Sequence, residues 1–135
     1  MTAKEYLNRY RVINNRIDDK LQRIEDLRSR ATRLSPTAMF DRNGNVSDRV
    51  GQNAARIADL ENEVEAMKRE AAGIRSELES TISKVDDIQL RDLLTMRYIH
   101  GYSWRKIAAK MGYSKDHVWG YLHRSALEKV NSFLS

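Results

Sequence analysis

The sequence predicts an all-α protein, with a long antiparallel helical hairpin in its N-terminal part and a small domain of short helices at its C-terminal end. Three observations lead to this fold class. The chain of 135 residues contains only one proline. Its apolar residues recur every three or four positions over two long stretches, which is the spacing of amphipathic helices. A Gly-Tyr-Ser tripeptide occurs twice, at residues 101–103 and 112–114, and indicates short helices separated by tight turns.

The first helix is predicted over residues 2–34. Its apolar side chains form one stripe with steps of three or four residues. The stripe consists of Tyr6, Tyr10, Ile13, Ile17, Leu21, Ile24, Leu27, Ala31 and Leu34. Ser35 and Pro36 end this helix, because a residue that precedes proline disfavours the helical conformation.

A linker is predicted over residues 35–47. Asn43 and Gly44 form a turn signal within it, since both residues tolerate the backbone angles that tight turns require. Met39 and Phe40 are apolar, and they are expected to fold back onto the helices.

The second helix is predicted over residues 48–84, with Ser47 or Asp48 as its N-terminal cap. Its apolar residues follow an almost strict seven-residue repeat. They are Ile57, Leu60, Val64, Met67, Ala71, Ile74, Leu78, Ile82 and Val85. A repeat sustained over four heptads, with charges on its flanks, is typical of a coiled coil rather than of a globular helix.

The two long helices carry opposite net charges, which suits a hairpin whose arms pack on each other. Residues 1–34 contain nine Lys/Arg and five Asp/Glu, a net charge of +4. Residues 48–85 contain six Lys/Arg and eight Asp/Glu, a net charge of −2. Residues 1–85 are therefore expected to form a helical hairpin domain. The same apolar stripes can instead pair with a second chain, and a hairpin can also dimerise through its outer faces, so a homodimer is expected.

A second domain is predicted over residues 86–135, where the composition changes. This segment contains both tryptophans and all three histidines, and it has eight Lys/Arg against five Asp/Glu. Residues 85–87 indicate a break in the preceding helix and the start of a new one. The three helices of this domain are predicted over residues 88–99, 104–111 and 115–129.

The repeated tripeptide predicts how these three helices are joined. A glycine just past a helix end adopts the left-handed conformation that other residues resist, and a serine caps the helix that follows. Gly101 and Gly112 are expected to end two helices, and Ser103 and Ser114 are expected to begin the next two. Three short helices connected in this way match the helix-turn-helix pattern.

Residues 90–127, LRDLLTMRYIHGYSWRKIAAKMGYSKDHVWGYLHRSAL, resemble the promoter-reading C-terminal domain of sigma-70 class RNA polymerase sigma factors. The resemblance implies binding to double-stranded DNA and contact with RNA polymerase. Residues 1–85 do not resemble the sigma domain that melts the promoter and binds the polymerase core. A helical N-terminal half joined to a sigma-like domain instead resembles small phage and prophage regulators of late genes, which implies a cytoplasmic protein of a bacterial host cell.

The third helix is predicted to read the major groove, as the second helix of a helix-turn-helix motif does. Val118, Tyr121, Leu122 and Ser125 are expected to face the core. The residues expected to contact bases, mostly on the opposite face, are Lys115, Asp116, His117, Trp119, Gly120 and His123. Lysine donates to guanine, a carboxylate accepts from cytosine N4, and an apolar ring packs on the thymine methyl group.

Contacts to DNA phosphates are expected from cations and helix caps around the same helix. The residues concerned are Ser103, Arg105, Lys106, Ser114, Arg124 and Lys129. Serine hydroxyls and lysine or arginine side chains are common phosphate ligands, and the positive end of a helix favours an anion. Trp104 is expected to pack in the core or against a cap.

The composition argues against several other classes of function. The chain has no cysteine, which excludes disulfides, thiolate metal sites and cysteine nucleophiles. No nucleophile lies with a base at catalytic spacing, so no enzyme activity, cofactor or metal site is predicted. No apolar run approaches the ~18 residues of a membrane span, so no contact with a membrane is expected. The net charge of +5 permits nucleic-acid binding without specifying it.

These features predict a sequence-specific double-stranded DNA-binding transcription regulator. Two alternatives remain open at this point. Phage small terminase subunits, which package DNA, also combine a helix-turn-helix with a helical hairpin, although they usually place the DNA-binding part first. A sigma-like adaptor that binds RNA polymerase rather than DNA is the other alternative.

Overall fold

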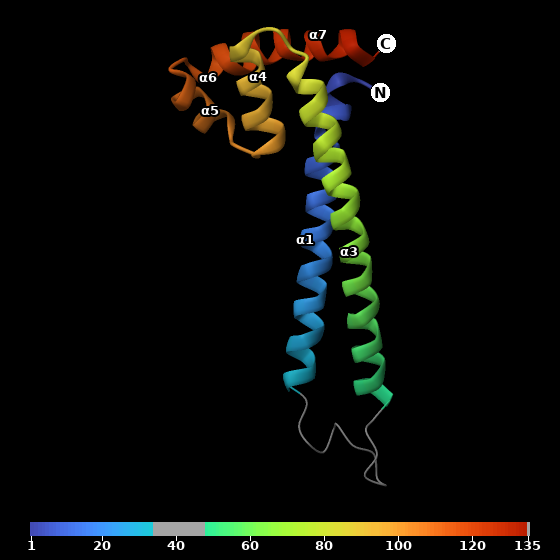
Figure 1. The fold of residues 1–135 in the computed structure, drawn as a ribbon. Coiled ribbons are helices and arrows are strands. Elements are labelled where there is room, and N and C mark those ends of the chain that lie inside the picture. The colour runs from blue at the N-terminus through green and yellow to red at the C-terminus, as the bar shows by residue number, and fades with distance from the viewer. Residues whose placement is uncertain (34–47, 135) are drawn as a thin grey trace. The chain divides into compact units, whose positions relative to one another are not determined.

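A computed structural model of the chain describes residues 1–33 and 48–134. The described residues form helices and short connections, with no β-strand among them (Figure 1). The predicted all-α class is therefore confirmed. The chain divides into two compact units. The first consists of Met1–Ile13 and Ala71–Ser135, and the second consists of Asn14–Glu70.

The two long helices begin and end within one residue of the predicted positions. Helix α1 spans Ala3–Arg33 and helix α3 spans Asp48–Ser83. Thr2 and Glu5 start α1 with reciprocal bonds, because the Thr2 Oγ1 accepts from the Glu5 backbone N–H at 3.1 Å and the Thr2 backbone N–H donates to the Glu5 carboxylate at 3.2 Å. This pair is a capping box, which satisfies N–H groups at the helix start.

Several predictions between the two helices fall outside the described residues. They are the linker over residues 35–47, the turn at Asn43 and Gly44, the return of Met39 and Phe40 onto the helices, and the cap at Ser47.

The second unit is a pair of antiparallel helical segments from one chain. Ile17, Ile24 and Leu27 of α1 are buried, as are Leu60 and Val64 of α3. Two ion pairs join the segments: the Lys20 Nζ lies 2.8 Å from a Glu63 carboxylate oxygen, and Arg28 pairs with Glu61. Within this unit the arms therefore pack on each other within a single chain. Leu21, which was expected in the apolar stripe, is instead 43% exposed.

The first unit brings three parts of the chain into one core. The start of α1 contributes Leu7, and the end of α3 contributes Leu78, each with no exposed surface. The buried Tyr6 hydroxyl lies 2.7 Å from the Thr81 hydroxyl, and Arg9 forms an ion pair with Glu77 at 2.8 Å. The buried residues that the C-terminal helices add are Leu90, Leu93, Leu94, Tyr98, Ile99, Ile107, Ala108, Val118, Leu122, Ala126 and Val130.

The compact units do not follow the expected division into residues 1–85 and 86–135. Residues 1–13 and 71–85 group with the C-terminal helices, because Leu7, Leu78 and Ile82 are buried in one cluster with the core of those helices. The spacing of apolar residues in each long helix is continuous across the boundary between the two units. The spacing therefore does not predict where one helix stops packing in one unit and begins packing in the other.

The C-terminal helices begin at the predicted break after α3. Asp87 caps helix α4, Ile88–Leu94, and its side chain accepts from the backbone N–H groups of Gln89 and Leu90. The chain continues through a π-helical turn, η1, over Thr95–Ile99. Gly101 then has a φ of 71°, the left-handed conformation predicted for it.

The helices after Gly101 follow the predicted order. Helix α5 spans Trp104–Met111. The next helical run consists of α6, Lys115–His117, the π-helical turn η2, Val118–Leu122, and helix α7, His123–Leu134. Residues 115–129 are thus helical, as predicted, but a π-helical turn interrupts the regular α-helical geometry.

Candidate nucleic-acid interface

The connection between α5 and α6 is a tight turn at Gly112, and each of the helices α5 and α6 begins at a serine cap. The Ser103 Oγ accepts from the Lys106 backbone N–H at 3.2 Å, and the Ser114 Oγ accepts from the His117 backbone N–H at 3.1 Å. Between them, Gly112 has a φ of 77°, and its N–H donates to the Ala108 carbonyl at 2.9 Å. Both serine caps and both glycine turns are therefore where the sequence predicts them.

The packing of α5 and η2 fixes which side of the α6–η2 run faces outward. Ile107 and Val118 have no exposed surface, and Leu122 is also buried. On the outer side, Lys115, Asp116 and His117 are all exposed. Trp119 is 56% exposed, although its ring is large and mostly apolar. These four side chains lie on the face predicted to contact bases.

Gly120 lies on the same run, and the protein itself has room for a larger residue there. An added Cβ would meet no atom within 4 Å apart from its own helix backbone and chain neighbours. The glycine therefore is not required for packing within the chain. A close approach by a bound molecule is a reason for glycine in such a position.

His123 was expected on this outer face, and this expectation is wrong. The side chain is 6% exposed, and its Nε2 lies 2.6 Å from the Tyr98 hydroxyl. The cause is the turn η2, in which the His123 N–H donates to the Val118 carbonyl five residues earlier. A π-helical turn contains one more residue than an α-helical turn, so the core-facing positions after it move one residue toward the C-terminus.

The same shift reverses one core prediction and weakens another. Tyr121, expected in the core, is 62% exposed. Ser125 is only partly buried, whereas Ala126 and Val130 have no exposed surface. The regular helical spacing places Val118, Trp119 and Leu122 correctly and misplaces Tyr121.

An exposed column of aromatic rings runs along the outer side of α6–η2. The His117 ring centroid lies 4.8 Å from that of Tyr113 and 5.3 Å from that of Tyr121. The Tyr113 hydroxyl also accepts from the Gln89 Nε2 at 3.0 Å, which ties the column to α4. Tyr113 and Tyr121 were absent from the predicted site, although a spacing of four residues between 113, 117 and 121 is a signal that could have found them.

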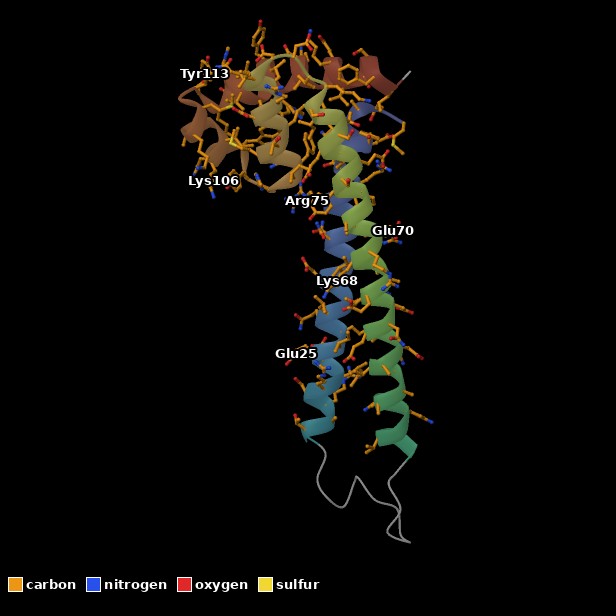
Figure 2. The ribbon with its side chains drawn as sticks, in the orientation of Figure 1. Glu25, Lys68, Glu70, Arg75, Lys106 and Tyr113 are labelled. Atoms are coloured by element: carbon orange, nitrogen blue, oxygen red, sulfur yellow. The ribbon has the colours of Figure 1, made fainter. Side chains whose placement is uncertain are left out.

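The cations predicted to contact phosphates are at the surface of the first unit. Arg105, Arg124 and Lys129 are exposed. The Lys106 Nζ lies 3.9 Å from the Tyr102 ring centroid, and Figure 2 shows Lys106 and Tyr113 on the part of this unit formed by α5 and α6. Ser103 and Ser114 use their oxygens as acceptors in the helix caps, so their hydroxyl hydrogens remain available to an anion.

Two further cations gather around Tyr102 and were not predicted as part of the site. The Arg97 Nη1 donates to the Tyr102 carbonyl at 3.1 Å, and the Lys110 Nζ lies 5.8 Å from the Tyr102 ring centroid. Within the described part of the chain, no carboxylate oxygen lies within 4 Å of a charged nitrogen of Arg97, Lys106 or Lys110. The result is a cluster of three cations without a counterion.

Behind this cluster lies a buried aromatic network. The Arg97 guanidinium stacks over Trp104 at 4.5 Å, and Trp104 lies 4.5 Å from the His123 ring. Burial raises the pKa of Tyr98 to about 12. Burial, followed by repulsion from Lys4 and Arg97, lowers the pKa of His123 to about 4. Trp104 thus packs against the core, which is one of the two placements predicted for it, and burial is the main reason that His123 stays neutral.

Within the described residues, no helix is both long enough and apolar enough to cross a membrane. One protein-family model matches the chain, over residues 48–131, and it describes a protein of unknown function, DUF1492. No curated protein and no solved structure matches the chain.

Proposed function

The chain belongs to the DUF1492 family, and from its own residues we propose that it is a phage-encoded, non-enzymatic transcription regulator that binds double-stranded DNA in a sequence-specific manner. The proposal of a regulatory role and a phage origin rests on the resemblance of residues 90–127 to sigma-70 class factors and to phage late-gene regulators. The proposal of DNA binding rests on the geometry of the α5–α6–η2 region.

The main support for the proposal is that the helical segment after Gly112 has one buried side and one exposed side. Its inner side is buried through Val118 and Leu122, and its outer side exposes Lys115, Asp116 and Trp119 at its N-terminal end. A recognition helix places its N-terminal residues on base edges in the major groove. An outer side that combines a donor, an acceptor and an apolar ring provides the groups that distinguish base pairs there.

In the proposed complex, each exposed residue has one role. Lys115 donates to guanine, Asp116 accepts from cytosine N4, and Trp119 packs on thymine methyl groups. Gly120 lets the helix backbone approach the duplex closely. His123 is removed from the set of base contacts because it is buried, and Tyr121 takes its place on the exposed side.

The phosphate contacts in this proposal are Arg105 and Lys106 from α5 and Arg124 and Lys129 from α7. Ser103 and Ser114 add hydroxyl donors next to the starts of their helices. Such contacts position the protein without reading sequence, and their strength falls with salt.

The experiment that tests the proposal is selection of bound duplexes from a pool of randomised DNA by the full chain, with Lys115→Ala and Arg105→Gln run in parallel. The wild type is expected to enrich one motif. Lys115→Ala is expected to relax the preference at one or two positions, by about 1–3 kcal/mol for each base that the lysine no longer reads. Arg105→Gln is expected to weaken binding to all sequences alike and to flatten the salt dependence.

Two results would contradict the proposal. If the wild type enriches no motif, the chain does not read sequence, and DNA packaging or binding to a protein becomes the better explanation. If Lys115→Ala leaves both the motif and the affinity unchanged, the recognition surface is not on α6.

A further inference from the structure

A second group of cations, on the first turns of α1, lies outside the proposed recognition surface. Lys4 and Arg11 are both exposed. They are seven residues apart, so they lie on the same side of the helix. Both lie on the side next to Leu7, which is fully buried in the core of the first unit. Arg9 lies on the opposite flank of the helix and pairs with Glu77 of α3.

The packing of α1 against the C-terminal helices brings this side of the helix to Arg97 and His123. The Ala3 N–H donates to the Asn131 Oδ1 of α7 at 3.0 Å, which fixes the start of α1. Burial, followed by repulsion from Arg11, lowers the pKa of Arg97. Lys4 likewise contributes to the lowered pKa of His123. Arg11 thus acts on Arg97, and Lys4 and Arg97 both act on His123, although α1 is far from these residues in the sequence.

These three cations have no counterion in the described part of the chain. No carboxylate oxygen there lies within 4 Å of their charged nitrogens. Like charges on one surface repel one another, and a bound anion would offset that repulsion. Arg97 also joins this group to the cations around Tyr102, because its Nη1 donates to the Tyr102 carbonyl at 3.1 Å and its guanidinium stacks over Trp104 at 4.5 Å.

The cationic surface therefore continues from α5 through Arg97 to α1. We propose that Lys4 and Arg11, together with Arg97, bind the phosphate backbone of the same duplex that α6 and η2 read. This inference rests on the proposed function, and it extends the DNA-binding surface to the first helix of the chain. A duplex suits the surface because its phosphates repeat along the backbone and can follow a row of cations from one helix to the next.

The test compares two double variants of the full chain that remove the same charge from the same helix. Lys4→Gln with Arg11→Gln removes the proposed contacts. Arg16→Gln with Arg23→Gln is the matched control, because both arginines are exposed residues of α1 in the second unit and neither has a carboxylate partner within 4 Å among the described residues. Circular dichroism and thermal unfolding first establish that both variants fold.

The dissociation constant for a duplex of about 30 base pairs, roughly three helical turns, is then measured over a range of salt concentrations. Removal of two phosphate contacts is expected to make the slope of log K against log salt less steep by about 1.8, since each contact contributes about 0.9. The control is expected to change the slope by less than half that amount. Ethylation interference identifies the phosphates whose modification weakens binding. One group of phosphates is expected to show interference with the wild type and the control, but not with the variant Lys4→Gln with Arg11→Gln.

Failure of this inference can be distinguished from failure of the proposed function. If the wild type binds DNA and the Lys4 and Arg11 variant has the same slope and interference pattern, only the extended surface is refuted. An equal decrease of the salt slope in both double variants would also refute the inference, because it would indicate a general effect of net charge. If the wild type shows no salt-dependent binding to any duplex, both proposals are refuted.

Discussion

At the scale of single residues, the buried pair of Tyr98 and His123 is the feature with the clearest chemistry. A pKa of about 12 keeps Tyr98 protonated at neutral pH, and its hydroxyl lies 2.6 Å from the His123 Nε2. A neutral hydroxyl and a neutral imidazole can share one hydrogen bond. Burial therefore keeps His123 neutral next to Tyr98 in the core of the first unit.

We predict that the stability of the protein falls as the pH drops through the range in which His123 would gain a proton. The pKa of His123 is about 4 in the folded protein, against 6.5 for the ordinary side chain. Between these values the unfolded chain binds more protons, so the free energy of unfolding decreases as the pH falls. The full contribution is present above pH 6.5 and amounts to about 3 kcal/mol at most. Urea unfolding at about pH 7 and about pH 5 measures it.

The controls for this prediction are glutamine variants of two histidines. His123→Gln keeps an acceptor for the Tyr98 hydroxyl but removes the titrating group, so the decrease in stability between the two pH values is expected to shrink. His117→Gln changes an exposed histidine and is expected to leave the decrease intact. Equal pH dependence in the wild type and in His123→Gln would show that the buried imidazole does not cause it.

Another residue-scale prediction concerns two neighbours in the turn η2. Tyr121 is 62% exposed and Leu122 is 7% exposed. Tyr121→Ala is expected to change the free energy of unfolding by less than about 0.5 kcal/mol, whereas Leu122→Ala is expected to cost about 2–5 kcal/mol. Chemical denaturation of both variants checks this. A large destabilisation in Tyr121→Ala would indicate that Tyr121 is buried, as the regular helical spacing predicts, and would contradict the π-helical turn.

At the scale of elements, the two Gly-Tyr-Ser tripeptides build two similar junctions. Each glycine has a positive φ, 71° at Gly101 and 77° at Gly112. Each serine hydroxyl accepts from the backbone N–H three residues later. These bonds satisfy N–H groups that a helix start otherwise leaves unpaired, which allows a helix as short as the eight residues of α5.

Glycines inside helices provide an element-scale prediction that separates stability from binding. Gly73 in α3 and Gly120 in η2 both leave open space for a Cβ. An alanine at either position is expected to raise the free energy of unfolding by about 0.5–1 kcal/mol, because glycine loses more backbone freedom on folding.

The two substitutions are expected to differ in DNA binding. Gly120→Ala adds a methyl group to the proposed recognition surface and is expected to weaken binding, whereas Gly73→Ala is expected to leave binding unchanged. Thermal unfolding and DNA titration of the two variants test both parts. Unchanged DNA binding in Gly120→Ala would mean that the helix backbone does not approach the duplex at that residue.

At the scale of the whole molecule, the first unit depends on parts of the chain that are far apart in sequence. Leu7 from α1 and Leu78 from α3 have no exposed surface, and they lie in one cluster with Leu93, Ile107 and Val118. The proposed DNA-binding helices therefore share one core with the start of α1 and the end of α3.

We predict that Leu7→Ala destabilises the first unit, which contains the proposed recognition surface, by about 2–5 kcal/mol. Leu21→Ala is the matched control, because Leu21 is also on α1 but is 43% exposed and belongs to the second unit. Disappearance of the near-ultraviolet signal of Trp104 and Trp119 on denaturation reports on the first unit. A separate chain of residues 86–135 is expected to lack cooperative unfolding, and a cooperative transition in it would contradict this view of the core.

The sequence by itself determined the features that depend on neighbouring residues. The 3.6-residue spacing predicted α1 and α3 almost to the residue, and the Gly-Tyr-Ser tripeptides predicted the turns and caps around α5, because caps and left-handed turns are satisfied within a few residues. Lys115, Asp116, His117 and Trp119 were assigned to the exposed side correctly for the same reason, since they precede or enter the turn η2.

Only the tertiary structure decided which part of the chain packs against each apolar helix face. A π-helical turn is rare within α-helices, and the regular spacing of apolar residues does not predict it. The turn η2 buried His123 and exposed Tyr121. The division of α1 and α3 between two units likewise follows from contacts between residues that are far apart in the chain, such as Leu7 with the C-terminal core. The spacing of apolar residues along one helix does not predict those contacts, because the spacing is the same whichever surface packs against the helix.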